Sequence, residues 1–403
     1  MDLATLKRRN KSLNAFADFD EAARDDPAQG ARHAAAGRLA GVRVGVKSNI
    51  AVEGLPWTAG LEGHRNRIAA EDASTVRALR DAGATILGTL NMEEGALGSK
   101  SDNPCYGAVQ NPHRIGYSPG GSSGGSGAAV AAGLCDAALG SDTMGSVRIP
   151  ASHCGVYGFK PATRAVSQHG LEPADKALDA IGPLARNLDM LQQVAFEISK
   201  MGPGIGDYRG ALLTDHGVDV HPGVARVFER AVGTLSQAPA SVSITHPNSR
   251  IRFAGFIHVS LQMARHLKGL PGLSPRLEKL LAYGPAREAT KLATDTQILN
   301  DTHTEVRRIV EEYGFLIMPT VPNPPFPHAQ KEPAAQADFT CLANIAGLPA
   351  LSIPAGWTDD GLPIGVQLVG KTGYEAGLFA MARYLDLRLD AYRPPASLTE
   401  GAK

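Results

Sequence analysis

In the stretch GGSSGGSGAAVAAG, residues 120–133, glycines and serines run directly into an alanine-rich segment of helical composition, and three interpretations compete for it. A flexible linker has this composition, but a linker is not normally followed at once by a helix former between strands. A phosphate-binding loop fits poorly, since the Walker pattern ends in Gly-Lys-Ser/Thr and these glycines lack the spacing of a dinucleotide loop. The third interpretation is a catalytic loop, whose glycines allow unusual dihedral angles while its serines point into a site at a helix N-terminus.

The segments before this loop predict an α/β fold. Val42, Val44 and Val46 alternate with smaller or polar residues, which is typical of a strand. Residues 72–83 combine an Asp or Ser to cap a helix, apolar residues at helical spacing and a terminating glycine. The β-branched stretch ATILGT follows, so the order is strand, helix, strand, as in a sheet covered by helices. After them we expect a helix at 127–134, a strand at 136–139 and a loop at 140–150.

Residues 184–313 are predicted to be largely helical. Four helices are expected there, at 184–200, 223–237, 253–267 and 295–313. FLIMPTVPNPPFP, LPALSIPAG and PIGVQLVG then read as strands, the first of which runs into a rigid proline loop. The sequence has no internal repeat at solenoid or propeller spacing.

Composition limits the function classes. With 403 residues, 43% of them hydrophobic and 20% charged, the chain is typical of a globular protein with a large core. Lys plus Arg and Asp plus Glu number 40 each, so no net charge favours nucleic acid or an anionic membrane as partner. The four cysteines form no C-x-x-C pair, which indicates neither a zinc site nor a disulfide framework and favours the cytoplasm. The N-terminus lacks an apolar signal segment, and the longest low-polarity stretch is too short to span a bilayer.

Two further short motifs favour the catalytic interpretation. GSDTMGSVRIP, residues 140–150, is a second loop of small residues after a strand, and GVKSN, residues 45–49, places a lysine at the end of an apolar strand. Together with the first loop, these segments resemble the amidase signature family, whose hallmark is a Ser-Ser-Lys catalytic triad. The resemblance covers about residues 39–186 and 315–385. It rests on GVKSNI, AGATILGTLNMEE, YSPGGSSGGSGAAVAAG, GSDTMGSVRIPASHCGVYGFKPA, IGPLAR, MPTVP and NIAGLPALSIPAG.

The resemblance implies a catalytic triad of Lys47, Ser122 as the bridging serine and Ser146 as the nucleophile. Ser123 and Ser126 are then loop-shaping hydroxyls beside the triad. The family has a cis peptide bond before the bridging serine, which corresponds to Gly121–Ser122 here. Neutral Lys47 would act as the base, so its pKa must lie below the ordinary value of about 10.4, and burial without a carboxylate partner is the physical route.

The resemblance also assigns supporting roles around the nucleophile. The oxyanion hole is expected from the backbone N–H groups of Thr143, Met144, Gly145 and Ser146. Asp142 and Arg148 are interpreted as a structural ion pair or hydrogen-bond brace. The family works without histidine, so we expect that His153 beside Ser152 is not catalytic and that His153→Ala keeps activity whereas Lys47→Ala loses it.

Two residues depart from the family pattern. Ser48 stands where the family usually has Asp, which puts the rate and pH optimum in question. Met144 stands where the family usually has Gly, and its side chain is expected to narrow or line the acyl pocket. A changed or damaged site is one consequence that these two replacements leave open.

The expected fold is a single α/β/α sandwich with a mixed central sheet flanked by helices, a single domain over residues 1–403. Residues 200–315 form its variable helical region for substrate binding. Arg265 in this region is the candidate ligand for a substrate carboxylate, and the alternative is that its helix serves only for packing. The main hypothesis is an amidohydrolase that converts a small carboxamide or urea-type amide to acid and ammonia. The resemblance implies no metal or cofactor, and a homodimer is a possible assembly. The alternatives are the glutaminase-like A subunit of a tRNA-dependent amidotransferase and a non-catalytic homologue.

Overall fold

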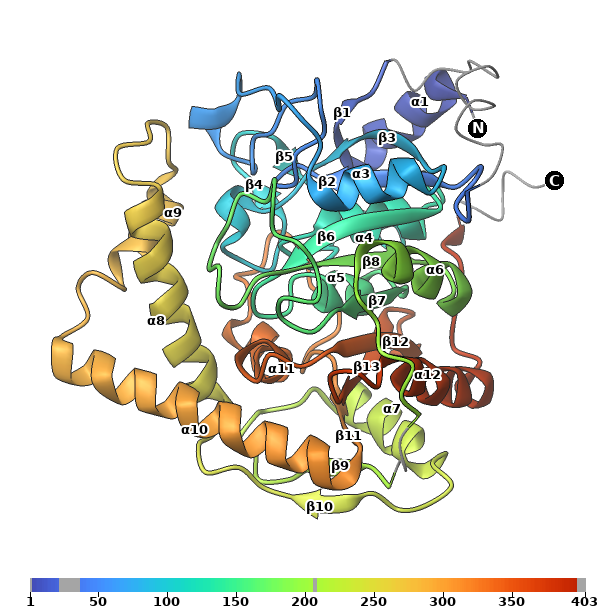
Figure 1. Ribbon diagram of the computed structural model, residues 1–403, viewed down its shortest axis with the longest axis vertical. Coiled ribbons are helices and arrows are strands. Elements are labelled where there is room, and N and C mark those ends of the chain that lie inside the picture. The colour runs from blue at the N-terminus through green and yellow to red at the C-terminus, as the bar shows by residue number, and fades with distance from the viewer. Residues whose placement is uncertain (1, 22–36, 206–208, 397–403) are drawn as a thin grey trace.

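The computed structural model describes residues 2–21, 37–205 and 209–396 (Figure 1). Within this part of the chain, one mixed sheet has eleven strands in the order β1-β3-β2-β6-β8-β7-β12-β13-β11-β9-β10. The strands are β1 (Phe16–Phe19), β2 (Arg43–Lys47), β3 (Thr85–Leu90), β6 (Ala137–Asp142), β7 (Tyr157–Lys160), β8 (Ala180–Ala185), β9 (Ala211–Leu213), β10 (Ala240–Val242), β11 (Phe315–Pro319), β12 (Ala350–Trp357) and β13 (Pro363–Gly370). A separate short hairpin pairs β4 (Asp102–Asn103) with β5 (Gly107–Ala108).

Helices cover both faces of this sheet, which confirms the predicted α/β class with a mixed sheet and flanking helices. One face carries α3 (Ser74–Asp81), α6 (Leu188–Ile198), α7 (Pro222–Gly233) and α12 (Glu375–Leu389). The other face carries α1 (Leu3–Leu13), α4 (Gly124–Ala131), α5 (Arg148–His153), α10 (Ala289–Tyr313) and α11 (Cys341–Ile345). The short 3₁₀ helices are η1 (Glu62–His64), η2 (Glu94–Ala96) and η3 (Ala334–Ala337).

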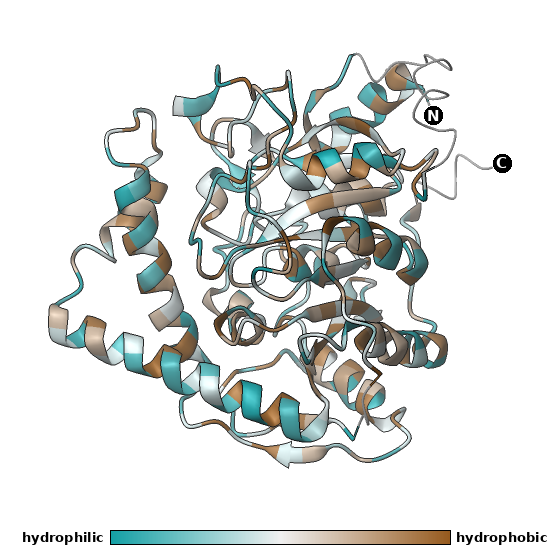
Figure 2. Ribbon diagram, viewed as in Figure 1, coloured by the Kyte–Doolittle hydropathy of each residue, from teal (hydrophilic) through white to brown (hydrophobic). Residues whose placement is uncertain are grey.

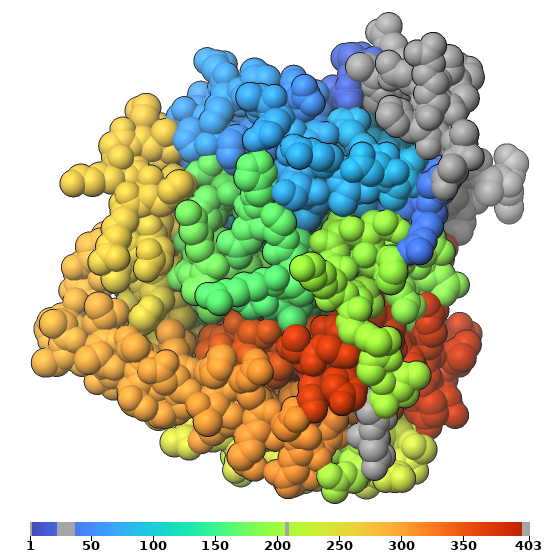
Figure 3. Space-filling model, viewed as in Figure 1, coloured from blue at the N-terminus to red at the C-terminus, as the bar shows by residue number. Residues whose placement is uncertain are grey.

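A helical arm, defined as α8 (Asn248–His266) and α9 (Pro275–Ala282), stands beside the sheet and is joined to it by α10 (Figure 1). Its buried side chains, among them Val259, Met263 and Leu277, form a small apolar cluster with Leu61 and Ala174 of the main body. The hydropathy colouring of Figure 2 shows apolar and polar positions mixed along these helices. In Figure 3 the arm borders the segments coloured for residues near 60 and 170. The arm therefore packs against loops of the body as well as against α10.

The structure corrects several of the expected boundaries. The helix expected at 127–134 begins at Gly124, so the glycines themselves form its first turn. The region 140–150 is not all loop, because β6 continues to Asp142 and α5 begins at Arg148. The helix expected at 184–200 was wrong at its start, because residues 184 and 185 end the fully buried strand β8 and α6 begins only at Leu188.

The expected side-chain cap of the helix after residue 72 is absent. α3 begins at Ser74 without a side-chain cap bond, because the carboxylate of Asp72 accepts from the Glu53 N–H and pairs with Arg80 instead. Tertiary partners thus outcompete the local cap. The division into a single domain with a variable region at 200–315 stays a prediction, although β9 and β10 of that region extend the same sheet.

Candidate active site

The sheet topology brings the three sequence motifs to one place. β2 and β6 are parallel neighbours, with Val46 opposite Leu139, so their carboxyl ends meet at the same edge of the sheet. Lys47 is the last residue of β2, and the loop after β6 carries Ser146. α4 packs on β6, which places Ser122 at the loop before that helix close to both.

Lys47 is fully buried, and within the described residues its ammonium group is bonded only to hydroxyl groups. Its Nζ donates to Ser122 Oγ at 2.7 Å and to Ser141 Oγ at 2.9 Å. No carboxylate within the described residues forms an ion pair or hydrogen bond with this ammonium group. Burial lowers the pKa of Lys47 to about 7, although the more distant charges of Asp179 and Asp142 act in the opposite direction. A substantial fraction of Lys47 is therefore a neutral amine near pH 7.

The loop of Ser122 has the backbone that the resemblance implied, since the Gly121–Ser122 peptide bond is cis. The Ser123 N–H donates to the carbonyl oxygen of Ser146 at 3.3 Å and so joins the two serine loops. Ser146 is partly exposed, whereas Ser122 is buried. Among the described residues, no hydrogen bond joins the two hydroxyl groups of Ser122 and Ser146.

Hydroxyl groups near Ser122 bind the backbone of β6. Ser123 Oγ donates to the carbonyl oxygen of Ser141 at 3.2 Å, and Ser126 Oγ donates to that of Leu139 at 3.0 Å. These contacts fit the expected loop-shaping role of the two serines.

Asp142 and Arg148 form a buried ion pair under the nucleophile loop, with 2.9 Å between Arg148 Nη2 and Asp142 Oδ1. The same carboxylate accepts from the N–H groups of Gly145 at 2.7 Å and Val147 at 3.1 Å. Burial alone would raise the pKa of Asp142, but the guanidinium group of Arg148 holds it at about 2. The carboxylate is thus ionised and fixes the turn on both sides of Ser146.

This network includes one donor of the expected oxyanion hole. The N–H of Gly145 already donates to Asp142 Oδ1 at 2.7 Å, and the expected oxyanion hole stays a prediction. The N–H groups of Thr143, Met144 and Ser146 make no hydrogen bond within the described part of the chain. These three groups are the available donors.

The two departures from the family pattern are accommodated without backbone strain. Met144 has no positive φ, and its side chain packs beside Gly255 of α8, where an added Cβ would lie 2.9 Å from Met144 Cε. Ser48 is buried, and its N–H donates to the carbonyl oxygen of Leu90 at 3.0 Å. Met144 therefore links the nucleophile loop to the helical arm.

His153 does not form a serine–histidine pair. Its Nε2 lies 3.3 Å from the carbonyl oxygen of Asn323, and its ring packs edge-on against Phe326. Burial lowers the pKa of His153 to about 4, and Ser152 Oγ is occupied by the N–H of Gly365 at 3.0 Å.

The structure does not join Arg265 to the three motifs. Arg265 is exposed on α8 and makes no hydrogen bond or ion pair with the described residues, whereas its neighbour His266 contacts Glu172. A cavity of about 880 Å³ instead lies between the arm and the body. Its walls include the aromatic side chains of Phe253, Phe256 and Tyr283.

Sequence reasoning missed three polar residues of the site. Ser141 accepts from both Lys47 and Asn49, and Asp179 accepts from Thr143 Oγ1 at 2.6 Å while burial raises its pKa to about 7. Asn344 donates to the carboxylate of Asp142 at 3.0 Å. Only Ser141 had a local signal, because it directly precedes Asp142 in the nucleophile motif.

Two kinds of feature are absent from the described residues. No cluster of three or more His, Cys, Asp or Glu side chains there could hold a metal ion. Likewise, none of the helices that the structure describes has the length and apolar character needed to cross a membrane.

Comparison with known proteins gives consistent matches. The family model described as Amidase matches residues 3–379. The A subunit of glutamyl-tRNA(Gln) amidotransferase from Exiguobacterium sibiricum is 33% identical over 444 residues, which cover 95% of this chain and 90% of that protein. The corresponding protein from Thermotoga maritima has a solved structure with 26% identity and a TM-score of 0.82, covering 98% of this chain and 92% of that one. A solved complex said to reveal the evolutionary origins of an s-triazine catabolic enzyme gives 29% identity and a TM-score of 0.88, covering 98% and 95%.

Proposed function

The chain belongs to the amidase family, and on that basis we propose that it hydrolyses a carboxamide with a Ser-Ser-Lys triad, as the ammonia-releasing A subunit of an amidotransferase-type assembly. The expectation of an amide-cleaving enzyme is confirmed by these relatives. The triad itself is our proposal. The observation that carries it is the 2.7 Å contact of Lys47 Nζ with Ser122 Oγ, where no described carboxylate is bonded to the lysine.

The first half-reaction forms an acyl-enzyme. Ser146 Oγ attacks the carbonyl carbon while its proton passes to Ser122 Oγ and the Ser122 proton passes to neutral Lys47. For this relay the Ser146 hydroxyl turns towards Ser122, a contact of the kind that commonly tightens only when substrate is bound. The C–N bond then breaks, and the proton held by Lys47 returns through Ser122 to the leaving nitrogen, which departs as ammonia.

The second half-reaction uses water as the nucleophile. Lys47, neutral again, removes a proton from water through Ser122, and the hydroxide oxygen attacks the Ser146 ester. The ester C–O bond breaks, the proton returns to Ser146 Oγ, and the carboxylic acid leaves. In both steps the N–H groups of Thr143, Met144 and Ser146 are the proposed donors to the oxyanion.

The relatives support the amidotransferase alternative better than the main hypothesis of a free-standing small-amide hydrolase. They are amidotransferase subunits that share a third of the residues across nearly the whole chain. The small-amide hydrolase of the main hypothesis remains the second candidate. A homodimer and a cytoplasmic location are further parts of the proposal, the latter supported by four free cysteines.

The test measures ammonia release from glutamine and from a panel of aliphatic, aromatic, dicarboxylic and urea-type amides. Each substrate is assayed with and without the other subunits of an amidotransferase from a related organism. Glutaminase activity that requires the added subunits supports the amidotransferase proposal, whereas release from another amide by the chain alone supports the second candidate. Ser146→Ala should abolish release, and His153→Ala, the matched control beside the site, should retain it.

Inactivity towards every amide, together with no labelling of Ser146 by an acylating reagent, would overturn both candidates. That result would favour the non-catalytic homologue.

A further inference from the structure

A buried carboxylate outside the triad supports the loop of Ser122. Glu93 follows β3, and its side chain is almost fully buried. Its Oε2 accepts from the N–H groups of Lys100, at 3.2 Å, and of Ser101. Its backbone N–H donates to the carbonyl oxygen of Ser122 at 3.1 Å. Glu93 therefore holds Ser122 directly and the turn at residues 98–101 through its side chain.

That turn is the surface on which the loop of Ser122 rests. A Cβ added to Gly121 would lie 2.8 Å from the carbonyl carbon of Ser99, so the two backbones are in direct contact. The Gly124 N–H, at the start of α4, donates to Ser101 Oγ at 3.1 Å. A shift of the turn would consequently displace the residues on both sides of Ser122.

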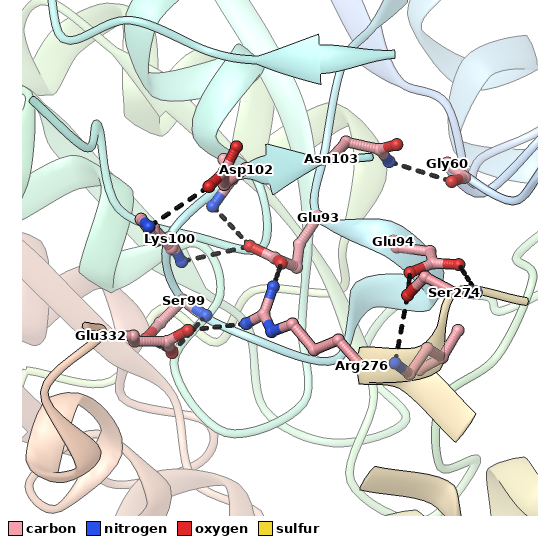
Figure 4. A network of polar contacts seen from close by, with 12 residues as sticks. Gly60, Glu93, Glu94, Ser99, Lys100, Asp102, Asn103, Ser274, Arg276 and Glu332 are labelled. Carbon is pink, nitrogen blue, oxygen red and sulfur yellow. Dashed lines mark hydrogen bonds and ion pairs between the residues drawn. The ribbon is translucent and has the colours of Figure 1, made fainter. Parts of the chain in front are cut away.

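The cation that balances Glu93 comes from the helical arm. Figure 4 shows the guanidinium group of Arg276, on α9, between the carboxylates of Glu93 and Glu332. Arg276 Nη2 lies 2.8 Å from Glu332 Oε2, and a Cβ at Gly98 would lie 2.8 Å from the same nitrogen. The absence of a side chain at Gly98 thus leaves room for the guanidinium group. Arg276 is 44% exposed and lines the 880 Å³ cavity.

We infer that Arg276 is a positioning residue for Ser122, acting from the helical arm through Glu93 and the turn at residues 98–101. The inference rests on the proposed function, because it assumes that Ser122 is the bridging serine.

The physical reason is the cost of an isolated charge. Burial raises the pKa of Glu93, and the nearby guanidinium group of Arg276 opposes that rise. Without Arg276 the carboxylate would take up a proton or move towards water, since an unpaired buried charge is costly. Either change weakens its bonds to the Lys100 and Ser101 N–H groups.

Removal of Arg276 need not detach the arm. Glu94 accepts from the Ser274 N–H at 2.9 Å and also contacts the Ser274 hydroxyl, so a second contact fixes the start of α9 (Figure 4). This separates docking of the arm from positioning of Ser122.

The experiment compares Arg276→Ala with Arg287→Ala in whichever amide assay the full protein supports. Arg287 is the matched control, because it pairs with Asp295 at 2.7 Å and stacks on Phe253 of the same arm without contacting the 98–101 turn. We expect kcat of Arg276→Ala to fall about 10- to 100-fold with little change in KM, since a small misplacement of a catalytic group has effects of this size. Millimolar guanidinium, which can enter the cavity, should restore much of the lost kcat, and Arg287→Ala should show neither the loss nor the rescue.

Arg276→Lys is the second variant, and it should keep most of kcat because the positive charge remains. Equal kcat values for Arg276→Ala and Arg287→Ala would overturn the inference, as would a loss in both Arg276 variants that guanidinium does not reverse. Ser122→Ala, assayed in parallel, distinguishes a failure of the proposed function from a failure of the inference about Arg276. Activity retained in Ser122→Ala contradicts the proposed function, whereas a dead Ser122→Ala beside an unaffected Arg276→Ala contradicts only the inference.

Discussion

The ammonium nitrogen of Lys47 lies 2.7 Å from the hydroxyl oxygen of Ser122, and both side chains are buried. Within the described residues Lys47 has hydroxyl partners only, Ser122 and Ser141. Desolvation therefore outweighs the attraction of the more distant carboxylates and leaves the lysine with a pKa of about 7. This relationship gives a lysine the protonation behaviour that a general base needs near neutral pH.

The first prediction concerns the pH dependence of amide hydrolysis. If neutral Lys47 is the base, kcat/KM should rise with pH through an apparent pKa of about 7 and level off above it. Lys47→Ala should lower kcat by at least about 10²-fold, the lower range for loss of a general base. The measurement is kcat/KM from acidic to mildly alkaline pH, at constant ionic strength. A flat profile through neutrality would contradict the assignment of Lys47.

The second prediction concerns Ser48, where the family usually has Asp. A carboxylate introduced by Ser48→Asp, next in sequence to Lys47, would favour the charged form of the lysine and raise its pKa. The rising limb of the kcat/KM profile should therefore move to higher pH. Ser48→Asn, similar in size but uncharged, is the control and should leave the limb in place. An identical profile for all three proteins would mean that the position is electrostatically neutral for Lys47.

The third prediction concerns Gly145 in the nucleophile loop. Gly145 has φ of +136°, and a Cβ there would lie 2.1 Å from Thr340 Oγ1. Gly145→Ala must consequently displace the loop beside Ser146, and kcat should fall by about 10²-fold. Gly233→Ala is the control, because its Cβ would meet no atom within 4 Å. Wild-type kcat in Gly145→Ala would show that the loop tolerates the shift.

The fourth prediction concerns the buried ion pair of Asp142 and Arg148. Arg148→Met removes one partner and leaves a buried carboxylate, which should lower the free energy of unfolding by about 3–5 kcal/mol. Arg226→Met breaks the exposed pair with Asp359, whose side chains are 59% and 92% exposed, and should change stability by about 0–1 kcal/mol. Urea unfolding of the two variants measures the difference. Similar small losses in both would show that Asp142 finds compensating partners.

The sequence predicted the elements whose pattern is local. Val44 and Val46 lie in β2, which begins directly after Val42, and most of LPALSIPAG and all of PIGVQLVG lie in β12 and β13. The Gly-Ser stretch was placed correctly as a loop leading into a helix, although its glycines begin the helix earlier than expected. Such patterns need no information about distant contacts.

What the sequence did not reveal depends on contacts between distant segments. β8 was not predicted, and its last two residues were included in a helix, because its apolar run has no distinctive period and becomes a strand only by pairing with β6 and β7. In the same way, Asp179 and Asn344 reach the nucleophile loop from 36 and 202 positions away in the chain. Arg265 was selected for its charge on a predicted helix, whereas Arg252 and Arg276 are arginines of the arm that form ion pairs with the body.

The last prediction concerns Lys160, a second buried lysine, whose Nζ donates to the carbonyl oxygen of Pro161 at 2.9 Å. Burial, with the nearby charge of Arg148, lowers its pKa to about 7. Between pH 7 and its ordinary pKa the unfolded chain binds more protons at this lysine than the folded chain, so its contribution to the free energy of unfolding rises with pH. Relative to Lys160→Met, the wild type should thus gain about 2 kcal/mol of stability between about pH 7 and about pH 9. Lys291→Met, at a 56% exposed lysine, should keep a constant difference from the wild type across this range. A constant difference for Lys160→Met as well would show that Lys160 keeps its proton, and its ordinary pKa, in the folded protein.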